Sequence, residues 1–253
     1  MIIKTQNTMK KFLAILAMAA SFLAVSCQKN NGDDDDDNKQ EETKGLGIKI
    51  DGTFDDWATL KSDVVFSAKN NADSPWDAVA EIRCCADKDF VYYYIRYNAT
   101  AAKEQLADND ALNIRLCLNT DGEFTTGYQK YFLDFYDFII EGPLADGAGK
   151  WTAFDGTLHQ HSGGTASADF HELLKPNNNL VMGKGAGSEY EILLAREIFN
   201  NAVPAGHKIG DTFYTGIRFY YAGWSEFSNM PNTSVAEGDG SGWGHLMKVT
   251  TAK

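Results

Sequence analysis

Alternating apolar and polar residues are the feature that most restricts the fold of this chain. Between residues 112 and 119, four aliphatic side chains alternate with polar residues and a cysteine. Successive side chains of a strand point to opposite faces, so this period of two predicts a strand with one buried face. Residues 78–85 show a similar alternation, and residues 90–97 form a dense β-branched and aromatic run. At least three strands are therefore expected in the first half of the chain.

The remaining pattern is also mostly that of strands. We expect strands at 131–140, 189–194, 213–221 and 244–251, with a hairpin around Asp146-Gly147. Helical signal is limited to a short helix at 195–201, which ends before Pro204, and a helical turn at 169–175 within the loop-like stretch 161–188. Many strands without helical crossovers predict an all-β antiparallel sandwich, immunoglobulin-like or jelly-roll-like.

The first 45 residues differ from the rest. Residues 1–26 combine three lysines, an apolar run and closing small residues, the layout of an export signal, and Cys27 follows directly. This end resembles a bacterial lipoprotein lipobox, which implies cleavage before Cys27 and acylation of its thiol. The alternative is an ordinary signal peptide followed by an accidental cysteine. Residues 27–45 are strongly acidic, with Asp33–Asp37 unbroken, and predict a disordered linker ahead of one domain at 46–253.

Acidic residues just after the cysteine resemble the surface-export signals of some Gram-negative lipoproteins. We therefore expect an outer-membrane lipoprotein, facing the periplasm or, preferentially, the cell surface, with membrane contact through the lipid alone. The formal net charge of −12 disfavours nucleic acid as a partner. No nucleophile elbow or zinc-protease helix is present, so no enzymatic activity is expected.

The sequence Ile48–Trp57 reads I-K-I-D-G-T-F-D-D-W. This phrase resembles the opening motif of family 9 carbohydrate-binding modules and their DOMON-like relatives. Residues 86–92, 109–114, 189–192 and 244–246 are similar to later motifs of that family, in the same order. The resemblance implies a β-sandwich with ligand-gripping loops, often stabilised by calcium. Trp57 itself is interpreted as a core residue, because a single indole after a turn usually fills the interior.

Two loop tryptophans are the candidate sugar-binding residues. Trp76 and Asp77 precede a predicted strand, while Trp224 follows one and is succeeded by Glu226 and Asn229. Sugars pack their C–H faces on indole rings, and their hydroxyls need amide or carboxylate partners. These five residues therefore predict a carbohydrate clamp. The alternative is that each ring only covers an end of the sandwich.

Two further patterns suggest metal ligands. Asn119, Asp121 and Glu123 place oxygens at alternating positions around a glycine turn, which Ca²⁺ could use, although an ordinary strand-ending turn also fits. His159-Gln160-His161 places two imidazoles on one face of a strand, with His171 as a third ligand within reach by sequence, or else forms an exposed loop pair. The three cysteines of the predicted domain are either small apolar strand residues or include one bridge to Cys117.

Together these features predict an exported, lipid-anchored protein that binds an oligo- or polysaccharide without cleaving it. Three other functions stay open. The domain could be an accessory or structural subunit of an outer-membrane nutrient-uptake complex, without a ligand of its own. It could be a haem-binding redox module, for which Met182, Met230 and Met247 are available axial ligands beside histidines. It could also be a glycoside hydrolase with a carboxylate pair.

Overall fold

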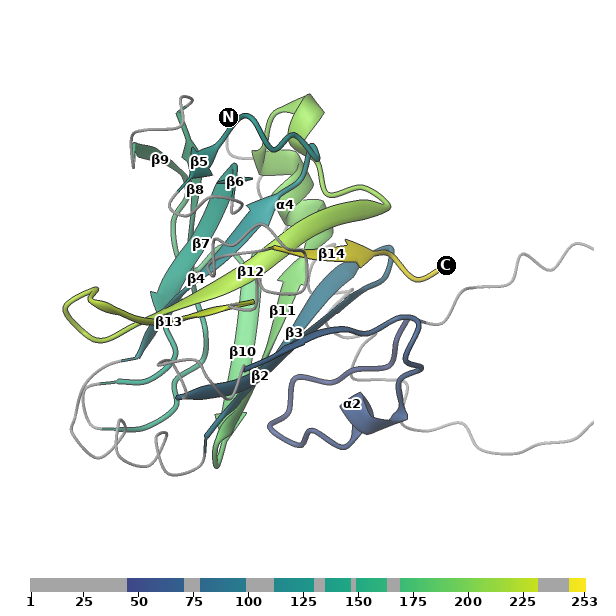
Figure 1. The fold of residues 1–253 in the computed structure, drawn as a ribbon, viewed down its shortest axis with the longest axis vertical. Coiled ribbons are helices and arrows are strands. Elements are labelled where there is room, and N and C mark those ends of the chain that lie inside the picture. The colour runs from purple at the N-terminus through teal and green to yellow at the C-terminus, as the bar shows by residue number, and fades with distance from the viewer. Residues whose placement is uncertain are drawn as a thin grey trace, which may run out of the picture. The chain divides into compact units, whose positions relative to one another are not determined.

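The predicted all-β sandwich is confirmed. A computed structural model describes residues 45–70, 78–98, 112–129, 135–146, 149–162, 169–231 and 246–253. They form two antiparallel sheets packed face to face (Figure 1). The predicted signal peptide, Cys27, residues 27–44 of the predicted linker, Trp76 and Asp77 lie outside the described residues.

Sheet A has five strands in the order β1-β2-β3-β11-β10. Their bounds are β1 Phe66–Lys69, β2 Val79–Ala86, β3 Phe90–Tyr97, β10 Val181–Ala186 and β11 Glu189–Ala195. Every pairing in this sheet is antiparallel. The predicted strands at 78–85, 90–97 and 189–194 are thus confirmed.

Sheet B has the order β13-β12-β4-β7-β8-β9, and β14 pairs with the first part of β12 on the side of β13. Its strands are β4 Asn113–Asn119, β7 Phe138–Pro143, β8 Thr157–His161, β9 Phe170–Leu174, β12 Thr212–Tyr220, β13 Glu226–Met230 and β14 Met247–Thr250. A short hairpin of β5 Tyr128–Gln129 and β6 Phe135–Tyr136 pairs separately. The predicted strand at 131–140 is therefore interrupted at Asp137, between β6 and β7.

Helical structure is sparse in the described residues. It consists of α2 Asp56–Thr59, α4 Arg196–Ala202 and the 3-10 turn η1 Ala205–His207. The helix expected at 195–201 is confirmed as α4, and it ends before Pro204 as predicted. Within the described ranges, no helix has the length and apolar character that a membrane span requires.

The main core lies between the two sheets. Side chains that alternate along β3 and β11 on one sheet face those of β4, β7 and β12 on the other. The largest of them are aromatic and include Tyr93, Tyr97, Tyr190, Phe138, Phe213 and Phe219. Cys84, Cys85 and Cys117 are buried and free, so the alternative of a disulfide to Cys117 is wrong. Burial raises the pKa of all three thiols, which are inert apolar side chains in this fold.

The N-terminal motif covers the outer face of sheet A. Trp57 is 3% exposed and packs beside Tyr94, with ring centroids 5.5 Å apart, so its interpretation as a buried structural residue is confirmed. Glu191 in β11 holds the motif in place. Its Oε1 accepts hydrogen bonds from the backbone N–H groups of Asp51 and Gly52 at 2.8 and 2.7 Å, and its Oε2 accepts one from the Trp57 indole at 3.4 Å.

Two predictions about loops are wrong. Residues 169–175 form strand β9 rather than a helical turn, and the glycine-rich segment 181–186 forms strand β10. Glycine is required in β10 because a Cβ at Gly185 would lie 2.5 Å from a ring carbon of Tyr190 and 2.7 Å from one of Trp151. The absent side chains leave room for these rings to pack across the strand. The glycines therefore indicate close packing here, not a loop.

Candidate functional site

The candidate ligand site lies on the outer face of sheet B, the face turned away from the core. Arg115 of β4 stands opposite Arg218 of β12 on one side and Glu141 of β7 on the other. All three belong to the set of outward-facing positions in their strands, because residues paired across a sheet point to the same face. This row of charges runs across three neighbouring strands.

Trp224 stands at the tip of the turn that joins β12 to β13. Its backbone N–H donates to the carbonyl of Tyr221 at 2.9 Å, and the N–H of Tyr221 donates to the carbonyl of Ser225 at 3.0 Å. The tryptophan has φ +59°, the left-handed conformation that a hairpin of this kind usually gives to glycine. Its side chain is 42% exposed, so core packing does not explain the choice of a large ring. A strained, exposed aromatic residue is a functional candidate.

The exposed ring leads directly into the charged row. The guanidinium carbon of Arg115 lies 5.1 Å from the Trp224 ring centroid and 5.0 Å from that of Tyr220. The two rings are 5.5 Å apart and tilted by 55°. Arg115 Nε also donates to Glu141 Oε2 at 2.7 Å, and Glu141 Oε1 lies 3.2 Å from His159 Nε2. We call Arg115, Glu141, Tyr220 and Trp224 the Trp224 cluster.

Electrostatics keep Arg115 charged in this cluster. Burial disfavours the guanidinium cation, but the neighbouring Tyr220 and Glu141 outweigh that cost and raise the pKa of Arg115. Burial raises the pKa of the Tyr220 phenol, which stays neutral. The site thus offers a cation, a carboxylate and two aromatic faces within one small area.

The predicted residues Glu226 and Asn229 lie beside this cluster. Both oxygens of Glu226 are 3.2 Å from Nη1 of Arg218, whose guanidinium carbon stands 5.4 Å from the Tyr136 ring centroid. Asn229 is paired with Arg218 across β12 and β13 and is 5% exposed. Among the described residues, its amide oxygen has no hydrogen-bond partner, which is uncommon for a buried polar atom.

The turn expected to bind calcium is organised differently from the prediction. Asn119 is fully buried, and its side-chain amide forms hydrogen bonds with backbone atoms. Its Nδ2 donates to the carbonyls of Glu123 and Phe135, and its Oδ1 accepts from the N–H of Gly122. Glu123 is exposed. Asp121 instead faces His207, with 3.5 Å between Asp121 Oδ2 and His207 Nδ1, and both lie near Asp137. Within the described parts of the chain, these three residues form a group that could hold a metal ion.

The two histidines of β8 differ in burial, because His159 is half-buried and His161 is buried. His159 and His161 share one face of the strand, as predicted, but His161 is buried, so the reading as an exposed loop pair is wrong. His171 pairs with Gln160 and therefore belongs to the opposite face. The expected three-histidine arrangement is not formed. Of the expected haem ligands, Met230 and Met247 are buried in the core, whereas Met182 is exposed on β10.

The site thus unites Trp224, Glu226 and Asn229 from the predicted clamp, and adds Arg115, Glu141 and Tyr220. Arg115 was visible in the sequence only as a polar residue on a strand face. Its role depends on the register of β4 with β7 and β12, which the sequence pattern does not specify. Comparisons with known proteins add no assignment: no protein-family model matches the chain, and no curated protein is similar to it at a significant level.

Proposed function

We propose that this protein binds carbohydrate, without cleaving it, at the Trp224 cluster on the outer face of sheet B. The observation that carries this proposal is Trp224, which is exposed, held in a left-handed conformation and in contact with Arg115. An indole provides the flat apolar surface on which a pyranose ring stacks. Arg115 and Glu141 supply a donor and an acceptor for hydroxyl groups.

Non-catalytic binding follows from how the carboxylates of this site are used. Glu141 is committed to Arg115 and His159, and Glu226 to Arg218. A general acid must hand a proton to the glycosidic oxygen, whereas these carboxylates already accept hydrogen bonds from arginine guanidinium groups. The cluster is therefore suited to holding a sugar rather than to protonating its glycosidic oxygen. Together with the expected lipid anchor on Cys27, this describes a glycan-capturing protein at a membrane.

The test is a panel of purified oligo- and polysaccharides, examined by affinity gel electrophoresis and calorimetry. At least one glycan should retard the protein, and Trp224→Ala should weaken that binding by about fivefold or more, since stacking contributes on the order of 1 kcal/mol or more. Phe124→Ala is the matched control, because Phe124 is exposed to a similar extent, 38%, but packs on Tyr214. Unchanged binding in Trp224→Ala, or no response to any glycan, would contradict the proposal.

A further inference from the structure

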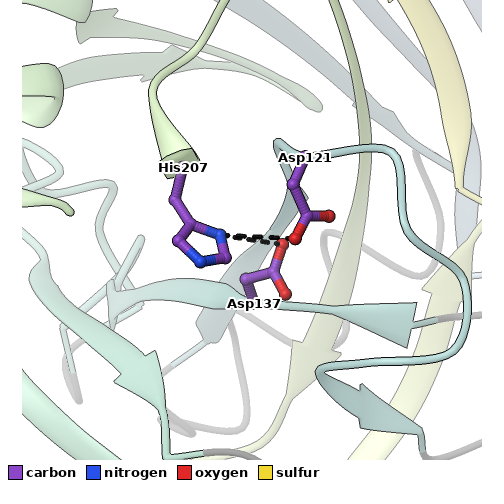
Figure 2. A group of neighbouring side chains, drawn as sticks. All are labelled: Asp121, Asp137 and His207. Carbon is purple, nitrogen blue, oxygen red and sulfur yellow. Dashed lines mark ion pairs between the residues drawn. The ribbon is translucent and has the colours of Figure 1, made fainter. Parts of the chain in front are cut away.

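A second group of polar side chains lies at the other end of β4 and takes no part in the Trp224 cluster. Asp121 follows β4, Asp137 stands between β6 and β7, and His207 closes η1 (Figure 2). Figure 2 shows the imidazole pointing at both carboxylates. His207 Nδ1 lies 3.5 Å from Asp121 Oδ2 and 3.9 Å from Asp137 Oδ2, and one donor atom from each residue lies within 4.8 Å of the other two.

The two carboxylates lie close together with few positive charges or hydrogen-bond donors near them. The Asp137 side chain is 6% exposed, and a carboxylate oxygen of Asp121 lies within 4.8 Å of one of its own. Among the described residues, no lysine or arginine forms an ion pair with either aspartate. The backbone N–H of Thr120 reaches Asp137 Oδ2 only at 3.4 Å. A buried carboxylate needs a cation or strong donors, and the described residues offer Asp137 only the His207 imidazole and this long hydrogen bond.

The His207 imidazole is held in place by neighbouring residues, but its Nδ1 atom makes no hydrogen bond to them. The Nδ1 atom of His207 is shielded from solvent and has no hydrogen-bond partner among the described residues. The ring packs edge-on against Phe138 at 5.7 Å, and the carbonyl of His207 accepts a hydrogen bond from the Thr120 hydroxyl at 2.8 Å. The same loop thus supplies Asp121 and fixes the backbone of His207. An imidazole nitrogen that faces two carboxylate oxygens is a set of donor atoms that a metal ion can use.

We infer that Asp121, Asp137 and His207 bind a divalent transition-metal ion of the zinc class. An imidazole nitrogen with two carboxylate oxygens suits Zn²⁺, Co²⁺ or Mn²⁺, whereas Ca²⁺ prefers an all-oxygen shell of six to eight ligands. Bonds of about 2.0–2.2 Å to zinc place tetrahedral ligand atoms roughly 3.4 Å apart. The two distances from His207 Nδ1 are already close to that separation, so only small side-chain movements are required.

The inferred ion would join three segments that are distant in sequence. It would tie the turn after β4, the β6–β7 junction and η1 into one unit. Six residues of extended chain, about 20 Å, separate Asp121 from Arg115. The metal site is therefore independent of the Trp224 cluster, and its failure would leave the proposed glycan binding untouched.

The test uses the full chain, purified without a histidine tag and stripped with a chelator. Calorimetry with Zn²⁺, Co²⁺, Ca²⁺ and Mg²⁺ should show a zinc site, which Co²⁺ also occupies with visible d–d absorption, and zinc should raise the thermal midpoint. Asp121→Asn and His207→Gln should each weaken this site by more than about tenfold, because each removes a ligand. Glu123→Gln and His171→Gln, which alter an exposed carboxylate of the same turn and an exposed imidazole, should bind zinc like the parent chain.

Three outcomes would overturn the inference. They are no zinc binding by the parent chain, unchanged zinc binding in both ligand variants, and a preference for Ca²⁺ that the same two variants abolish. Circular dichroism of each variant distinguishes loss of a ligand from loss of the fold. His207→Gln is the more informative variant, since the His207 side chain is 30% exposed, against 18% for Asp121.

Discussion

Replacing Trp224 by glycine and by alanine separates the conformational cost of this residue from the contacts of its ring. Both variants lose the same indole contacts with Tyr220 and Arg115. They differ at φ +59°, where an L-residue with a Cβ is less stable by roughly 1–2 kcal/mol. Glycine avoids that strain but gains roughly 0.5–1 kcal/mol of flexibility in the unfolded chain. Trp224→Gly should therefore be more stable than Trp224→Ala by about 0.5–1 kcal/mol.

Urea unfolding followed by far-ultraviolet circular dichroism measures this difference, with equal m-values as the check that both variants unfold in the same way. The matched control is Ala222→Gly in the same turn, where the described backbone has no positive φ. That change should lower stability by roughly 0.4–1 kcal/mol, the ordinary direction for glycine. Both Trp224 variants should lose glycan binding to the same extent. Greater stability of Trp224→Ala than of Trp224→Gly would refute the reasoning from backbone strain.

Further expectations concern the rest of the sandwich. Trp57→Ala should lower the free energy of unfolding by about 3–5 kcal/mol, as measured by denaturant unfolding. Because Trp57 is buried on the other sheet, the folded fraction of this variant should still bind glycan, as measured by calorimetry. Burial opposes ionisation of Glu81, but hydrogen bonds from two arginines outweigh it and lower the pKa of Glu81. The stabilisation by the Glu81 carboxylate is therefore present above pH 4.5 and is lost as the pH falls through the pKa of the folded state. In unfolding curves from pH 7 to pH 3, the difference in stability between the parent chain and Glu81→Gln should shrink accordingly. Gly185→Ala should cost about 1–3 kcal/mol, because its Cβ would collide with the Trp151 ring, whereas Gly206→Ala, which meets nothing within 4 Å, should leave the unfolding midpoint unchanged or raised.

The strands that the sequence predicts well are those with dense apolar runs. Residues 90–97 and 189–194 were predicted within one residue of β3 and β11, because β-branched and aromatic side chains signal strands whatever their partners. Strand β10 was missed because Gly183 and Gly185 remove that signal, and their purpose is visible only once Tyr190 and Trp151 are in place. The glycine content of this segment favours a loop, whereas the packing of Tyr190 and Trp151 against it requires a strand with small residues.

The candidate sites show the same division. Trp224 could be identified because a loop tryptophan between polar residues is unusual in itself. Arg115 and Glu141 could not be paired, since their contact depends on strand register. His207 could not be linked with Asp121, because they meet only when η1 folds back onto the end of β4. Local chemistry is readable along a chain, whereas long-range contacts must be seen in three dimensions.

The bonds of Glu191 to the Asp51-Gly52 turn have a consequence for how this protein can vary. These hydrogen bonds hold the N-terminal motif against the outer face of sheet A, so that face is already covered by the chain itself. Substitutions in that segment should therefore change the stability of the sandwich. Arg115, on the outer face of sheet B, is partly exposed, so substitutions at that position leave the covered face of sheet A untouched.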